Sequence, residues 1–159
     1  MSETIVEGYL QVVVFSLVDQ ETRKKEDYGI SIEQVREIRP MEPITKVPNA
    51  KSYIKGVMNL RGMIVPIMDV HEKLGFNSKT SSPKARILVA DAQSKLIGLL
   101  IDEVDQVMRI PLKEIETHLS GGLESLEYIK GVAKTSGRLI VLLDIGKLLE
   151  CDSCSNSEK

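Results

Sequence analysis

The chain has 159 residues, of which 42% are hydrophobic, 28% are charged and only 4% are aromatic, and its net charge at pH 7 is −2. This length and hydrophobic content allow a buried core, so the composition excludes a disordered tail. The balanced charge and the few aromatic side chains disfavour generic nucleic-acid binding. No apolar run approaches the ~20 residues of a membrane-spanning helix and no signal-peptide pattern opens the chain, so we expect an intracellular protein.

The first third of the chain predicts strands. Residues 10–17 are rich in β-branched and aromatic side chains, residues 19–27 form a polar hairpin loop, and residues 28–32 resume the strand pattern. Residues 33–38 lead to Pro40, which predicts a turn followed by a strand that ends at the proline. Residues 1–8 are interpreted as a flexible arm.

Residues 53–70 and residues 128–145 are two copies of one sequence unit. They align without a gap at an offset of 75 (128 minus 53). Seven positions are identical: the five of the Tyr-Ile-Lys-Gly-Val start, a later glycine and an aspartate. A second pair of segments, residues 29–38 and residues 98–107, aligns at an offset of 69 (98 minus 29). A self-match of this length predicts a duplicated structural unit.

Each copy of the unit has the pattern of a hairpin followed by a short helix. Gly62 suits a tight turn from which Arg61 projects, and Asp69 and Asp144 are placed to cap helices that begin at the next residue. Residues 86–90 and 96–110 predict further strands, and residues 112–118 predict a short helix. Many short strands with polar turns, present twice, predict an all-β fold of two small packed barrels.

The side chains that usually perform catalysis form no recognisable set. His71 and His118 are far apart and neither has a partner at ligand spacing, and His71 is expected on a short surface helix. Asp69 and Asp144 could be paired carboxylates, but helix capping explains them more simply. The glycines form no phosphate-binding loop. We therefore expect no enzyme activity, no metal and no cofactor, and a scaffold that works by binding.

The two cysteines, Cys151 and Cys154, lie in the polar segment 150–159. A zinc site needs four ligands and a redox pair needs a folded context, and neither is visible. The segment is interpreted as a flexible tail with exposed thiols.

Three segments, taken together, resemble the CheW family of bacterial chemotaxis coupling proteins. They are residues 28–38, Val47-Pro48-Asn49, and residues 54–69 with the Asn59-Leu60-Arg61-Gly62 turn. The resemblance covers residues 9–149. It implies two five-stranded SH3-like β-barrels with short helices and a hydrophobic core between them. On this basis residues 9–74 are expected mainly in the first barrel and residues 85–145 mainly in the second, with terminal segments free to cross over.

The resemblance also implies a function. Members of this family are cytoplasmic adaptors, recruited to membrane receptor arrays, that join the tips of chemoreceptors (methyl-accepting chemotaxis proteins) to the regulatory domain of the histidine kinase CheA in chemotaxis signal transduction. Receptor binding in the groove between barrels implies a set of six positions here: Val35, Glu37, Ile38, Arg61, Ile97 and Val104.

Two further positions, Lys55 and Gly56, fall on a strand implicated in contacts with the receptor or the kinase. Arg61 and Glu37 are expected as a charged pair on the groove's rim. The alternative interpretation of both is an ordinary solvated charge, and Val35, Ile38, Ile97 and Val104 could equally be core residues.

Other functions stay open from the sequence. The nearest is the coupling module of a CheV-type protein or of CheA itself, although residues 150–159 leave no room for a receiver or kinase domain. A small-barrel nucleic-acid-binding protein belongs to another class, and the charge balance argues against it.

Overall fold

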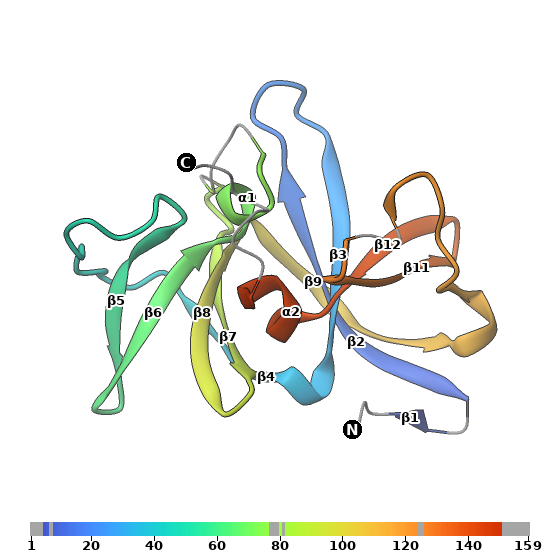
Figure 1. The fold of residues 1–159 in the computed structure, drawn as a ribbon, viewed down its shortest axis with the longest axis horizontal. Coiled ribbons are helices and arrows are strands. Elements are labelled where there is room, and N and C mark those ends of the chain that lie inside the picture. Colours follow the sequence, from blue (N-terminus) through green and yellow to red (C-terminus); the bar gives the residue numbers. More distant parts are fainter. Residues whose placement is uncertain (1–4, 7, 77–79, 81, 124–125, 151–159) are drawn as a thin grey trace.

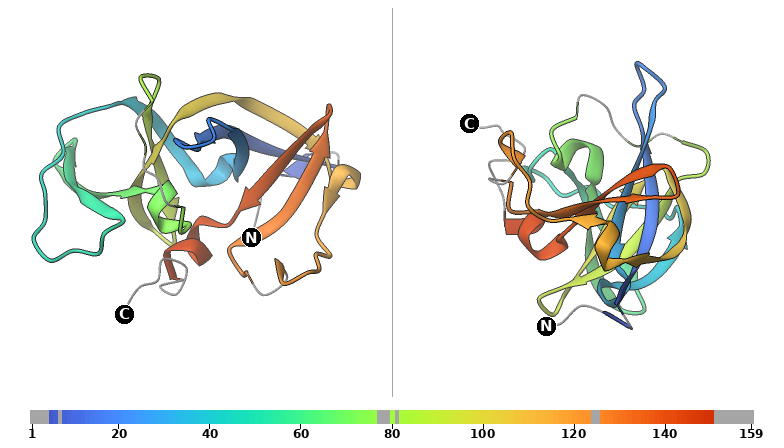
Figure 2. Two further views of the ribbon diagram at one scale, coloured as in Figure 1. Left: turned by 90° about the horizontal axis from the view of Figure 1, so that it is seen from above. Right: turned by 90° about the vertical axis from the view of Figure 1, so that its right-hand side faces the viewer.

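The computed structural model describes residues 5–6, 8–76, 80, 82–123 and 126–150 of the chain. Within them, β-strands dominate, and the helices are short: α1 (Val70–Lys73), α2 (Ile145–Glu150) and the 3-10 turns η1 (Ile32–Gln34) and η2 (Leu112–Glu114). The strands form two sheets, which lie side by side along the long axis of the molecule with α2 between them (Figure 1, Figure 2). The all-β prediction is confirmed.

The first sheet, which we call barrel 1, has the strand order β4-β7-β8-β6-β5. The segment after β4 returns to the opposite edge, where Thr45 pairs with Val57 of β5 and joins the two ends of the sheet. Its strands are β4 (Val35–Pro40), β5 (Ile54–Leu60), β6 (Met63–Asp69), β7 (Arg86–Ala92) and β8 (Lys95–Ile101).

The second sheet, barrel 2, has the order β1-β2-β3-β12-β11-β10, and β9 pairs with the other side of β2. Since β9 runs through η2 into β10, which pairs with β11, this sheet also curls round on itself. Its strands are β1 (Ile5–Val6), β2 (Tyr9–Val18), β3 (Lys25–Ser31), β9 (Glu103–Pro111), β10 (Ile115–Glu116), β11 (Ile129–Thr135) and β12 (Arg138–Leu143).

The barrels are not simply the two halves of the sequence, because the leading strands of the expected segments 9–74 and 85–145 cross over to the other barrel. Strands β7 and β8 complete barrel 1, while β2 and β3 lie in barrel 2 with β9 to β12. The cause is a pair of parallel ladders: β6 bonds to β8, and β12 bonds to β3. Each copy of the repeated hairpin therefore takes its neighbouring strand from the other half of the chain.

The two parallel ladders have equivalent registers. Ile67 lies opposite Gly98, and Leu142 lies opposite Gly29, so the offsets of 75 and 69 from the sequence repeat recur in space. Side chains of the facing strand fill the space beside both glycines. A Cβ at Gly98 would lie 2.5 Å from Cδ1 of Ile67, and one at Gly29 would lie 3.1 Å from Cδ2 of Leu142. Close packing of the exchanged strands explains these glycines inside strands.

Three hydrophobic clusters result from strict alternation along the strands. In β2, Val12 and Val14 point into barrel 2, while Val13, Phe15 and Leu17 point into a core shared by both barrels. Strand β7 divides its side chains in the same way between the interior of barrel 1 and the shared core. Because both faces of these strands are buried, their sequences are continuous apolar runs.

Some local expectations change. Asp69 accepts the main-chain N–H of His71 at 2.9 Å and Asp144 that of Lys147 at 3.1 Å, which confirms both helix caps. His71, however, is only 1% exposed, so its predicted place on the surface is wrong. The helix predicted over residues 112–118 is also wrong, because after η2 the chain pairs with β11 as β10.

The terminal segments are only partly covered by the structure. Ile5–Val6 pairs antiparallel with the start of β2, so this part of the expected arm is a strand. Residues 151–159, including Cys151 and Cys154, lie outside the described residues.

We predict that Gly98→Ala lowers the free energy of unfolding by about 1–3 kcal/mol, because the added methyl group overpacks the junction of β6 and β8. Urea denaturation measures the change. Gly29→Ala is the matched control in barrel 2, where the nearest atom is 0.6 Å further away (3.1 minus 2.5), and its effect should be smaller. A Gly98→Ala protein as stable as the wild type contradicts the close-packing argument.

Candidate partner-binding site

Arg61 and Glu37 meet on the surface of barrel 1. Arg61 and Gly62 form the β5–β6 turn with φ values of 51° and 87°, the left-handed pair typical of a two-residue hairpin. The side chain of Asn59 secures the turn by accepting the N–H of Gly62 at 2.8 Å. From this turn the Arg61 guanidinium donates two hydrogen bonds to the Glu37 carboxylate, at 2.7 and 3.1 Å.

This bidentate pair holds the pKa of the Glu37 carboxyl below its usual value, through the hydrogen bond from Arg61 and then the one from Arg39. Arg39 in turn pairs with Glu42, so four charged side chains form a row beside β4. The Arg61 side chain is 70% exposed, whereas that of Glu37 is 24% exposed. An ion pair so open to water is screened by salt and adds little to folding, but it can meet a partner.

The apolar candidates lie in or near the shared core. Ile97 is only 6% exposed and belongs to it, while Val35 and Val104 are half-buried and pack against it from barrel 1 and barrel 2. Ile38 is exposed on β4, next to Glu37 in sequence, and is not among the residues of the core. The structure therefore places Val35, Ile97 and Val104 in or against one core and leaves Ile97 little surface for a partner.

Lys55 and Gly56 have structural contacts of their own. The Lys55 ammonium pairs with the carboxylate of Glu72 on α1. Gly56 has a φ of 147°, and a Cβ there would collide with the main-chain oxygen of Thr45. This glycine lets the segment that joins the ends of barrel 1 approach β5.

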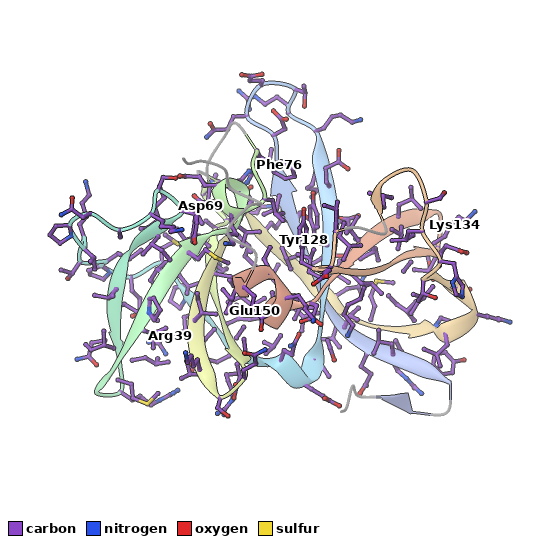
Figure 3. The ribbon with its side chains drawn as sticks, viewed as in Figure 1. Arg39, Asp69, Phe76, Tyr128, Lys134 and Glu150 are labelled. Atoms are coloured by element: carbon purple, nitrogen blue, oxygen red, sulfur yellow. The ribbon has the colours of Figure 1, made fainter. Side chains whose placement is uncertain are left out.

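Two exposed aliphatic residues occupy equivalent places in the repeated hairpins. Ile64 is 68% exposed and Leu139 is 63% exposed, and they are 75 residues apart (139 minus 64). The β5–β6 and β11–β12 hairpins lie toward opposite ends of the long axis (Figure 1). Lys134, the cross-strand neighbour of Leu139, lies at the outer end of barrel 2 (Figure 3). Sequence reasoning missed this pair, although aligning the two copies places one aliphatic residue over the other.

Among the residues that the structure describes, the buried polar groups do not form a catalytic set. Asp69 caps α1, and burial raises the pKa of its carboxyl although the N–H of Thr80 opposes the shift. Across the described segments of the chain, no three His, Cys, Asp or Glu side chains gather as a metal site would require. Nor does any helix in the described part reach the length and apolar character needed to cross a membrane.

Comparison with known proteins agrees with this fold. The CheW-like domain model matches residues 11–152. The chain is 32% identical to the chemotaxis protein CheW of Klebsiella aerogenes over 132 residues, which cover 82% of this chain and 80% of the relative. It is 31% identical to the CheW of Rhizobium meliloti over 143 residues, covering 89% and 88%.

A solved structure agrees over almost the whole length. The crystal structure of the scaffolding protein TtCheW from Thermoanaerobacter tengcongensis superposes with a TM-score of 0.75 at 30% identity, covering 91% of this chain and 94% of that one. With the family model spanning both barrels, the chain belongs to the CheW family of non-catalytic chemotaxis scaffold proteins.

Proposed function

We propose that this chain couples the cytoplasmic tips of chemoreceptors to the histidine kinase CheA. The observation that carries the proposal is the ion pair between the exposed Arg61 of the β5–β6 turn and Glu37 of β4, the strand whose first residue, Val35, packs against the core that both barrels share. An amphipathic receptor helix would place its apolar face against Val35 and Val104, and the charges would fix its register. Ile38 extends this surface outward from β4.

The hairpins at the two ends of the molecule are the proposed kinase-binding surfaces. The regulatory domain of CheA is expected to resemble this chain, and Ile64 and Leu139 offer similar exposed aliphatic contacts at both ends. Head-to-tail contacts between similar domains generate rings or chains. Within such an array, interfaces of ~800 Å² or less per partner suffice, because linked sites raise the effective concentration of one another.

In this role the chain catalyses no reaction; it passes the receptor's preference for one arrangement of the linked domains on to the kinase. A receptor changes kinase activity only if it binds one arrangement of the linked domains better than another. Receptor binding would also bring the protein to the cytoplasmic face of the membrane.

We expect Arg61→Glu to weaken receptor binding at least tenfold while the urea midpoint of unfolding stays close to that of the wild type. The substitution reverses a rim charge whose solvent exposure makes its pairing weak. Co-sedimentation with receptor fragments and CheA measures the binding. An Arg61→Glu chain that unfolds, or one that binds receptors normally, contradicts the assignment.

The double variant Arg61→Glu with Glu37→Arg separates two roles of the pair. It restores an ion pair of reversed polarity. Recovery of binding would mean that the pair only holds the β5–β6 turn against β4. We expect no recovery, because the receptor is proposed to contact the charges directly.

Ile64→Glu and Leu139→Glu should each reduce binding of the CheA regulatory domain tenfold or more and leave receptor binding unchanged. Both substitutions place a charge at the centre of a proposed apolar contact, and both sites are exposed enough to keep the fold. Val107→Glu, at another exposed aliphatic residue, on β9, is the control and should bind the kinase domain normally. Calorimetry with the isolated regulatory domain measures the affinities, and wild-type affinity in both variants would refute this surface.

A further inference from the structure

Asp102 stands where the chain passes from one barrel to the other. Strand β8 of barrel 1 ends at Ile101, and β9 of barrel 2 begins at Glu103. The Asp102 carboxylate is buried and contacts both barrels. Its Oδ2 accepts the N–H of Val18, at the end of β2, at 2.7 Å, and lies 2.5 Å from Nε2 of His71 on α1.

His71 is held from more than one side. Its main-chain N–H bonds to the Asp69 cap, and its ring meets the edge of Phe76 at a centroid distance of 6.0 Å. The distance between Nε2 and Oδ2 is that of a hydrogen bond, so a proton lies between the imidazole and the carboxyl group. The imidazole thus links α1 of barrel 1 to a carboxylate that also holds β2 of barrel 2.

The second copy of the repeat lacks this contact. The position equivalent to His71 is Gly146 (71 plus 75), and the one equivalent to Asp102 is the exposed Glu33 (102 minus 69). At Gly146 a Cβ would lie 3.3 Å from Nε2 of Gln93, so the turn between β7 and β8 occupies that space instead. The two sides of the junction between the barrels therefore have different contacts: the His71–Asp102 pair on one side, and Gln93 against Gly146 on the other.

We propose that the His71–Asp102 pair fixes the angle between the barrels and thereby the shape of the receptor groove. Apolar contacts in the shared core are not directional and leave some freedom of rotation, whereas a buried hydrogen bond has a defined geometry. Asp102 also lies two residues before Val104, so it anchors the strand that carries one wall of the groove. His71 and Asp102 are positioning residues, and their effect on receptor binding rests on the proposed function.

The distance between the barrels in the free protein tests the proposal without any partner. Spin labels at Ile64→Cys and Leu139→Cys, in a chain with Cys151→Ser and Cys154→Ser, report this distance by pulsed electron paramagnetic resonance. We expect His71→Leu to shift or broaden the distance distribution. In the unlabelled chain, the same variant should bind receptor fragments at least tenfold more weakly and bind the CheA regulatory domain normally.

His71→Gln is the rescue variant, because its amide nitrogen can replace Nε2 of the imidazole, and it should restore the distribution and the receptor affinity toward wild type. A His71→Leu protein unchanged in both measurements overturns the proposal, as does a folded His71→Gln protein that behaves like His71→Leu. If His71→Leu does not fold, the same measurements on His71→Asn, which stays polar but is too short to reach Asp102, decide the question. Failure of the wild-type chain to bind receptors would overturn only the proposed function, since the distance measurement needs no receptor.

Discussion

The parallel pairing of each repeated hairpin with a strand from the other half of the chain is the constraint on which the rest of the structure depends. It places β2, β3, β7 and β8 in the middle of the molecule and buries several of their residues on both faces. A slip of one residue would turn every side chain of such a strand to the wrong face. The hydrophobic clusters on the two faces of the strand therefore fix its pairing register. The glycines at the two parallel ladders let the exchanged strands pack closely.

This arrangement produces the properties that a coupling scaffold needs. The shared core gives the two barrels one interior, and the half-buried Val35 and Val104 pack against it from barrel 1 and barrel 2. The duplicated hairpins, in contrast, are turned outward and repeat one aliphatic contact at both ends. The two copies thus share an exposed aliphatic position, Ile64 and Leu139, and differ at the turn, where the first copy has the charged Arg61 and the second has Ser136.

Much of this could be predicted from the sequence, and the omissions have physical reasons. The strands and the helix caps followed from local patterns, and the choice of Arg61 and Glu37 followed from resemblance to a family, whereas the direct contact between these two side chains did not. The strand exchange could not be predicted, because alternation and turn signals report only on residues that are close in sequence. Strand β3 pairs with β12, which lies more than a hundred residues away (142 minus 29 is 113 for Leu142 and Gly29). His71 was misplaced for the same reason: its burial depends on β2 and Asp102, which no helical pattern around residue 71 reveals.

The exchange has a consequence for how the protein is made. Barrel 2 cannot close until β11 and β12 have left the ribosome, and barrel 1 must wait for β8, so the nascent chain carries unpaired strands for most of its synthesis. Pairings so distant in sequence fold slowly, because a long loop must close before any contact stabilises it. A polypeptide interrupted near its middle would therefore possess neither complete barrel.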